Sequence, residues 1–202
     1  MNNKTHGRSI SNARKITTTA VMSAIAFILM YIEVSIPIMP SFVKLDFSEL
    51  PALLTSFALG PWYGVLVCLI KNLLHLPFTS SAAVGELSNF ILGAIFTLTA
   101  GYIYQAKRSK KTALIGSVVG AFAMALLSFP SNYFIVYPFY TNFMPMEAII
   151  GMYQAIMPSI QSLAQALLVF NVPFTFCKGL VDAIITFLIY KRISPIILGN
   201  RK

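Results

Sequence analysis

Charged residues are scarce in this sequence. Only 10% of its 202 residues are Asp, Glu, Lys or Arg, whereas a soluble domain carries roughly 25%. Uncharged runs near or beyond about 18 residues, a length typical of bilayer spans, occupy most of the chain: Ile16–Ile32, Leu87–Gln105, Thr112–Met146 and Ala148–Cys177. The scarcity of charge excludes an ordinary water-soluble domain, and the runs predict an all-α integral membrane protein.

The residues and motifs of most enzymes and metal sites are also lacking. The two cysteines, Cys68 and Cys177, lie in apolar stretches and predict no disulfide framework. Neither His6 nor His75 has a second ligand at a suitable spacing, so we expect no metal site. The sequence contains no GxxxxGK[ST] phosphate loop, no nucleophile–base pair and no internal repeat. We therefore predict a protein that is not an enzyme, has no cofactor and cannot couple ATP hydrolysis by itself.

Acidic residues are few, and the basic residues are grouped. The chain has 6 acidic and 15 basic residues, a net charge of +9. Twelve of the basic residues form three clusters beside expected helix ends: Lys4, Arg8, Arg14 and Lys15; Lys107, Arg108, Lys110 and Lys111; and Lys191, Arg192, Arg201 and Lys202. The positive-inside rule assigns such clusters to the cytoplasm. We expect this charge to face the anionic inner leaflet of the lipid bilayer and not nucleic acid.

The number of spans depends on the uncharged stretch 51–70. A single span here would put the basic loop at 107–111 outside, against the charge rule. Gly60-Pro61 is a strong breaker, so we split the stretch into a hairpin of two short helices. The sequence then predicts a single membrane domain, 1–202, as a six-transmembrane-helix bundle with both termini cytoplasmic. The helices are expected at about 11–36, 46–59, 62–76, 87–106, 111–137 and 168–190, with outer loops at about 37–45, 77–86 and 138–167.

Three segments need separate interpretation: the N-terminus, the surroundings of Pro130 and the stretch 142–166. The basic start followed by Ala24-Ile25-Ala26 resembles a signal-peptide cleavage site, but the apolar run continues to Ile32, which favours a retained first helix. We expect the fifth helix to be interrupted near Pro130. The stretch 142–166 is rich in Gln, Ser and Pro and is interpreted as an excursion on the outer surface.

Polar residues inside the apolar runs fall towards the outer face. Lys178 lies 13 residues before Lys191, about 20 Å along a helix. The others are Lys71 and Asn72 in the third helix, Asn89 in the fourth, Asn132 and Tyr133 in the fifth, and Lys44, Asp46 and Glu49 in the first outer loop. A charge at the bilayer centre costs about 2.5–3.5 kcal/mol and usually faces a partner or a wet cavity. The convergence predicts a polar pocket that opens outward.

Simpler interpretations remain open for several of these groups. Lys178 and Asp182 are four residues apart and could form an ion pair that neutralises itself within one helix. Asn132 could serve as an interhelical hydrogen bond, worth about 0.6 kcal/mol. The aromatic side chains from Tyr133 to Tyr140 are typical of an interfacial belt, although one or two could stack on a planar ligand.

Ala20 and Ala24 have the small-xxx-small spacing in the first helix. Such a stripe allows two membrane helices to approach closely. It is compatible with packing inside the protein or with a partner.

Taken in order, several motifs carry a family resemblance. These are LDFSELPALL at 45–54, the GPWYG turn at 60–64, KNLL at 71–74, an Asn-bearing fourth helix, SNYF at 131–134 and PFTFCKG at 173–179. From about Ala20 to Arg192 the chain resembles the riboflavin-binding S components of energy-coupling factor vitamin importers.

The resemblance implies a six-helix bundle that holds riboflavin near the outer face beneath the first outer loop. It implies a membrane coupling subunit and two ATP-binding subunits as partners, with Ala20 and Ala24 as the docking surface. It implies loop contacts to the vitamin from Lys44, Leu45, Asp46 and Phe47, and pocket roles for Asn89, Asn132 and Lys178. We add Asn72, Tyr133 and Thr175 as candidate substrate-binding residues.

One position departs from the family pattern. Thr175 stands where such proteins are expected to have Asn, so the hydrogen bond to the edge of the ring could instead come from Asn171.

The predicted function is therefore capture of riboflavin outside the cell membrane and its delivery inward with separate energising subunits. Alternatives are an S component for another vitamin, such as thiamine or a folate, or a standalone secondary transporter. The lack of a repeat and of an ion site argues against the last of these.

Overall fold

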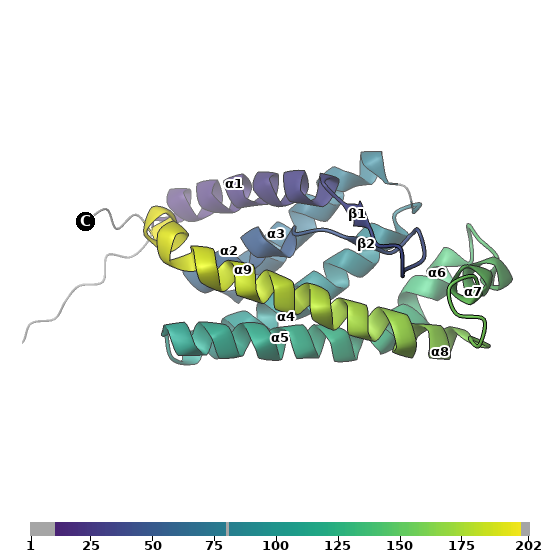
Figure 1. Cartoon of the computed structure of the whole chain (residues 1–202). Coiled ribbons are helices and arrows are strands. Elements are labelled where there is room, and N and C mark those ends of the chain that lie inside the picture. The colour runs from purple at the N-terminus through teal and green to yellow at the C-terminus, as the bar shows by residue number, and fades with distance from the viewer. Residues whose placement is uncertain (1–10, 80, 199–202) are drawn as a thin grey trace, which may run out of the picture.

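The chain forms a long bundle of helices with two distinct ends (Figure 1). The computed structural model describes residues 11–79 and 81–198. The starts of α1 and α5 and the end of α9 lie at one end of the bundle, and the two short strands and α6, α7 and α8 lie at the other (Figure 1). Arg14, Lys15 and Lys110 belong to the first of these ends.

The first helix, α1 (Asn12–Tyr31), begins at Ser11, whose hydroxyl accepts a hydrogen bond from the Arg14 amide. It ends five residues before the predicted boundary at 36, so that boundary was wrong. The chain then forms β1 (Val34–Ser35), which pairs antiparallel with β2 (Lys44–Leu45). Pro37 and Pro40 lie in the turn between the two strands and disfavour helix there.

A helical hairpin follows, as Gly60-Pro61 predicted. Helix α2 (Glu49–Leu59) and helix α3 (Pro61–His75) meet at Gly60, whose φ of 126° is a conformation that side chains other than glycine rarely adopt. The two helices are about 16 and 22 Å long. Gly64 allows them to touch, because a Cβ there would lie 2.9 Å from the Ala52 carbonyl oxygen.

Two long helices come next. The short η1 (Leu76–Phe78) leads to α4 (Val84–Ala106), and a tight turn leads to α5 (Lys110–Ser131). The interruption expected near Pro130 is a change of helix type: the α-helix ends at Ser131, and the chain continues without a break into a π-helical turn, η2 (Asn132–Val136), and then α6 (Tyr137–Tyr140). Single π turns of this kind occur inside longer helices and accompany kinks.

The excursion at 142–166 contains α7 (Met146–Gln154) and α8 (Leu163–Ala166). A second π turn, η3 (Leu167–Asn171), joins α8 to α9 (Val172–Leu198) without a break. The continuous helix made of α8, η3 and α9 therefore begins at residue 163, earlier than the predicted start at 168. It packs closely on α5 at Gly179, where a Cβ would meet that of Ala121 at 2.8 Å.

Four helical stretches in the described chain are long and apolar enough to cross a membrane: Asn12–Tyr31, Val84–Ala106, Lys110–Tyr140 and Leu163–Ile189. Their outward side chains are largely apolar; Phe122, Leu126 and Leu188, for example, are 59%, 62% and 68% exposed. An outer surface of this kind is favourable only in a nonpolar solvent. The fold is that of a multi-pass, all-helical membrane protein.

Candidate ligand-binding site

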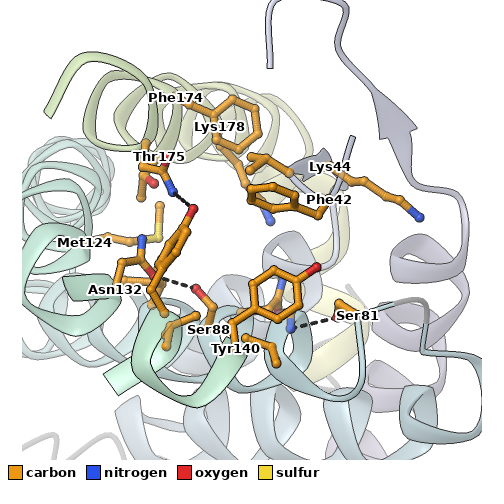
Figure 2. A pocket seen from close by; sticks show the side chains of 18 of the residues that line it. Phe42, Lys44, Ser81, Ser88, Met124, Asn132, Tyr140, Phe174, Thr175 and Lys178 are labelled. Atoms are coloured by element: carbon orange, nitrogen blue, oxygen red, sulfur yellow. Dashed lines mark hydrogen bonds between the residues drawn. The ribbon is translucent and has the colours of Figure 1, made fainter. Parts of the chain in front are cut away.

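A cavity opens at the end of the bundle that carries the strands, α6 and α7. Its volume is about 140 Å³. Figure 2 shows Lys178, Thr175 and Phe174 entering from α9, with Asn132 and Tyr140 on another wall and Phe42 near the mouth. The polar lining residues are Lys44, Glu49, Ser81, Ser88, Asn89, Tyr137, Tyr140, Asn132, Asn171, Thr175 and Lys178.

An ion-pair cluster forms the inner wall of this cavity. Lys178 Nζ lies 2.9 Å from Asp46 Oδ2 and 2.9 Å from Glu49 Oε2, and Lys71 Nζ lies 2.8 Å from Glu49 Oε1. All four side chains are largely buried. Two ammonium groups and two carboxylates therefore compensate one another, which is the condition for keeping such charges out of water.

Lys178 pairs with these two carboxylates and not with Asp182. The oxygens of Asp182 are buried without a hydrogen-bond partner in the described part of the chain. The ion pair within the helix, which the sequence left open as the simpler alternative, is therefore not formed. The reason is that the loop and the start of α2 bring Asp46 and Glu49 to the Lys178 ammonium at hydrogen-bonding distance.

Asp46 ties the first loop to the bundle. Its carboxylate accepts hydrogen bonds from the Ser48 amide at 2.9 Å and from Asn89 Nδ2 at 3.3 Å, in addition to Lys178. Burial opposes its ionisation, but the charges of Lys178 and Lys71 outweigh burial and lower the pKa of the Asp46 carboxyl to about 2. The loop is fixed by a charged group that stays ionised at neutral pH.

Asn72 orients the Asn89 amide that bonds Asp46. Its Nδ2 donates to the Cys68 carbonyl oxygen at 2.7 Å and to Asn89 Oδ1 at 3.2 Å. Asn89 in turn donates to Asp46. The amide of Asn72 therefore orients Asn89, which itself lines the cavity.

A second hydrogen-bonded group, formed by Tyr137, Tyr153 and Asn171, contributes Tyr137 and Asn171 to the cavity lining. The Tyr153 hydroxyl donates to Asn171 Oδ1 at 2.7 Å, and Asn171 Nδ2 donates to the Tyr137 hydroxyl at 3.2 Å. The two tyrosine hydroxyls also contact each other. Burial and the neighbouring Tyr137 raise the pKa of Tyr153 above its ordinary value, so its hydroxyl remains a donor. We call these three residues the tyrosine–asparagine triad.

The predicted site residues divide into three groups. Those that line the cavity are Lys44, Asn89, Asn132, Thr175 and Lys178. Four others do not line the cavity: Leu45, Asp46 and Phe47 lie in the first loop, at or just after β2, and Asn72 lies on α3. Tyr133 is 38% exposed and stacks on Phe129.

The placement of Tyr133 follows from the π turn. Within η2 the residues that line the cavity are Asn132 and Val136, and Tyr137 follows directly after it. Tyr133 therefore faces outward, and Tyr137 supplies the aromatic ring in its place. The ammonium of Lys44 also points away from the cavity centre and pairs with Glu33 (Figure 2).

Sequence reasoning placed Glu49 near the pocket without naming it as a ligand contact, and it missed other lining residues, above all Ser88, Tyr137 and Phe42. The sequence signal for Tyr137 was present in the crowd of aromatic residues around it. Phe42 gave no such signal, because its place depends on how the loop folds back. Its ring lies 6.3 Å from that of Tyr137 and 5.6 Å from that of Tyr140, edge to face.

The cavity combines aromatic walls with a few fixed polar groups, the usual composition of a small-molecule site. Amide, hydroxyl and ammonium groups offer both donors and acceptors to a ligand. Among the described residues no cluster of three or more His, Cys, Asp or Glu could hold a metal ion. The site is suited to binding and releasing an organic molecule.

The predicted docking residues lie elsewhere, on α1. Ala20 and Ala24 are exposed, whereas Thr19, Met22, Ser23 and Ala26 of the same helix are buried. The two alanines therefore do not serve packing within the described chain. Large apolar side chains surround them, including Ile16 and Ile28, which are 69% and 55% exposed.

Comparison with known proteins supports this class of membrane-embedded binding protein. The sequence profile described as "ECF transporter, substrate-specific component" matches residues 14–190. "Riboflavin transporter RibU" of Staphylococcus aureus (strain TCH60) is 35% identical over 181 residues, 90% of each chain. "Riboflavin transporter FmnP" of Bacillus subtilis (strain 168) is 31% identical, over 93% of this chain and 96% of the relative.

Solved structures agree. The structure titled "Structure and mechanism of the S component of a bacterial ECF transporter" superimposes with a TM-score of 0.74 at 34% identity, covering 95% of this chain and 100% of that one. ThiT from Listeria monocytogenes has a TM-score of 0.61 at 15% identity and shares the fold. The chain belongs to the family of substrate-specific components of ECF transporters.

Proposed function

We propose that this chain captures riboflavin from the outer side of the cell membrane and delivers it inward as part of an energy-coupling factor importer. The observation that carries the proposal is the composition of the cavity. Aromatic rings of Phe42, Tyr137 and Tyr140 stand beside the Asn89 and Asn132 amides and the Lys178 ammonium. The isoalloxazine ring is flat and apolar on its faces, with donors and acceptors along its edge, and such walls suit it.

The relatives support the same ligand. Two proteins named as riboflavin transporters each align over at least 90% of this chain. The residues that line the cavity lie inside the matched region, 14–190. A carrier of another vitamin, such as thiamine or a folate, is the second candidate within this family and would differ only in the pocket. The charges of the pocket are self-compensated, which favours a neutral ligand such as riboflavin over cationic thiamine.

The orientation proposed is a six-helix bundle with both ends of the chain in the cytoplasm. In it α2 and α3 count as spans although they are short. The starts of α1 and α5 and the end of α9 share one end of the bundle (Figure 1), and Arg14, Lys15 and Lys110 belong to that end. The positive-inside rule assigns it to the cytoplasm of a prokaryotic plasma membrane. The cavity then faces outward.

The first loop acts as the gate in this proposal. A cavity of about 140 Å³ is smaller than the roughly 300 Å³ at which drug-sized ligand sites begin. Riboflavin can therefore enter only when the loop moves. The contacts of Asp46 with Lys178 and Asn89 are the ones that such movement breaks and remakes. We also assign contacts with the vitamin to Leu45 and Phe47, which flank Asp46, once the loop has reclosed.

A membrane coupling subunit and two ATP-binding subunits complete the proposed transporter. The exposed stripe of Ala20 and Ala24 on α1 is the proposed docking surface, because small side chains let another helix approach closely. Large apolar neighbours on α1 would pack around the contact.

The direct test is purification of the full chain in detergent from cells supplied with riboflavin. We expect flavin absorbance in the purified protein and a stoichiometric, saturable quenching of flavin fluorescence when riboflavin is added to protein freed of ligand. Thiamine and folate are titrated in parallel as competitors. Binding of either in preference to riboflavin would replace the proposed ligand, and absence of any vitamin binding by folded protein would overturn the function.

A further inference from the structure

A second cavity lies between α2, α5 and α9 and shares no lining residue with the first. Its volume is about 200 Å³. Its described walls are Phe57 of α2, the first turns of α5 and the 186–188 segment of α9; the lining residues are Phe57, Lys110, Ala113, Ser117, Thr186, Phe187 and Leu188. The start of α5 belongs to the end of the bundle opposite the strands (Figure 1), so the cavity lies near that end.

The polar side of this cavity contains a hydroxyl without a partner. Thr186 is 1% exposed, and its Oγ1 makes no hydrogen bond to any described residue. Ser117 lies on the same wall and uses its hydroxyl proton to bond the Ala113 carbonyl oxygen at 2.9 Å. A buried hydroxyl left unpaired is unfavourable. Thr186 therefore has a donor available for a ligand acceptor in the cavity.

The electrostatic field at the same place favours an anion. Helix α5 begins at Lys110, and the Ser109 hydroxyl caps it by accepting a hydrogen bond from the Thr112 amide; its first turn has no acidic residue, so no carboxylate offsets the partial positive charge of the helix start. Lys110 lines the cavity, and no Asp or Glu is among the described lining residues. Lys107, Arg108 and Lys111 are exposed close by in sequence and add to the positive potential.

The remaining lining is apolar. Phe187 and Leu188 are exposed on the outside of the bundle, and Phe57 is 3% exposed. A ligand that fits both parts has an anionic head and a hydrocarbon portion that continues along the outer surface. Basic pockets between membrane helices on the cytoplasmic side bind lipid head groups in this manner.

We infer that this cavity binds the head group of an anionic phospholipid of the inner leaflet, with its phosphate beside Lys110 and the α5 start and within reach of the Thr186 hydroxyl. The leaflet assignment rests on the orientation in the proposed function. The site itself depends only on the side chains named here. It is separate from the vitamin cavity and needs no movement of the first loop.

The test uses the purified full chain in neutral detergent and titrates phosphatidylglycerol, with phosphatidylcholine as the neutral control. Bound lipid is counted by native mass spectrometry. We expect one phosphatidylglycerol to bind in preference to phosphatidylcholine. Thr186→Val should weaken that binding about five-fold, because the variant loses one hydrogen bond, and Thr186→Ser should restore it. Lys110→Gln should weaken binding by a similar factor.

Lys111→Gln is the matched charge control, since Lys111 is exposed beside Lys110 but does not line the cavity. Equal losses in the two lysine variants, with no loss in Thr186→Val, would mean diffuse attraction to the surface and overturn the inference. Displacement of the lipid by equimolar inorganic phosphate would assign the site to a free anion instead. Circular dichroism checks the folding of each variant, and riboflavin titration is run alongside. Failure of riboflavin binding with lipid binding intact would therefore count against the proposed function alone.

Discussion

Lys178 and Asp46 are 132 positions apart in the sequence, yet the Lys178 ammonium lies 2.9 Å from the Asp46 carboxylate. This contact joins α9 to the loop that covers the ligand cavity. It is buried on both sides, with side-chain exposures of 11% and 8%. A buried pair of this kind is costly to break by removing one partner, because the other charge is left without compensation.

The first prediction compares two identical substitutions. Asp46→Asn removes the partner of Lys178 and one acceptor for Asn89, so we expect riboflavin affinity to fall by about ten-fold or more. Asp182→Asn is the matched control in α9. Its carboxyl makes no hydrogen bond to the described residues, and the ammonium groups are already balanced by Asp46 and Glu49, so affinity should change less than three-fold.

Flavin fluorescence titration measures both variants of this pair. Equal losses in Asp46→Asn and Asp182→Asn would show that Lys178 depends on both carboxylates and would contradict the assigned pairing.

The second prediction concerns pH. The charges of Lys178 and Lys71 outweigh the burial of Asp46 and lower its carboxyl pKa from 3.8 to about 2. A carboxyl with a lower pKa in the folded state stabilises the fold above its unfolded pKa, and this stabilisation is lost as the pH falls through the folded value. We expect a loss of about 2 kcal/mol between about pH 4 and pH 2. Thermal unfolding in detergent measures it.

Asp46→Asn provides the reference for the pH experiment, because other carboxyls titrate in the same range. The difference in unfolding temperature between wild type and Asp46→Asn should be constant above about pH 4 and shrink below it. A difference that does not change with pH would refute the role assigned to this carboxylate.

Local signals in the sequence were enough to predict the helical hairpin and the general location of the pocket. Gly60 and Pro61 act on their own backbone, so their effect needs no knowledge of distant residues. The convergence of Asn89, Asn132 and Lys178 followed from counting residues along helices of known rise. These three side chains line the same cavity.

Partners brought together by tertiary structure could not be predicted in the same way. Asp182 is close to Lys178 in sequence, but the carboxylates that reach Lys178 come from the loop and α2. Tyr133 and Tyr137 are both aromatic and lie one turn apart, and only the π turn determines which of them faces the cavity. The sequence contains no simple mark of a π turn beyond Pro130.

The third prediction addresses the tyrosine–asparagine triad. Tyr153 donates to Asn171, which lines the cavity next to Thr175, so the Tyr153 hydroxyl positions that amide from outside. Tyr153→Phe should reduce riboflavin affinity about five- to ten-fold, since an orphaned amide oxygen costs about 1–3 kcal/mol and is free to reorient. The double variant Tyr153→Phe, Asn171→Leu tests whether the amide contacts the ligand. Riboflavin affinity returns towards wild type if the Asn171 amide makes no such contact, and it stays low if the amide binds the ligand.

Tyr133→Phe serves as the control for this experiment. Its ring stacks on Phe129 and it does not line the cavity, so affinity should be unchanged. Fluorescence titration is again the measurement. If Tyr133→Phe weakened binding and Tyr153→Phe did not, the assignment of the aromatic wall would be reversed.

The fourth prediction separates binding from transport. Ala24→Trp places a large ring on the exposed stripe of α1, where a close helix–helix approach requires small side chains. Riboflavin binding to the purified chain should remain within about two-fold of wild type, because the stripe is on the outside of the bundle and the cavity is not disturbed. Uptake of radiolabelled riboflavin by cells that also contain the coupling and ATP-binding subunits should be abolished.

Leu126→Trp, at a 62% exposed position on α5, provides an equally bulky control and should leave uptake intact. Normal uptake by Ala24→Trp would exclude the stripe as the docking surface, whereas loss of uptake in both variants would point to a general effect of bulk on the membrane-facing surface.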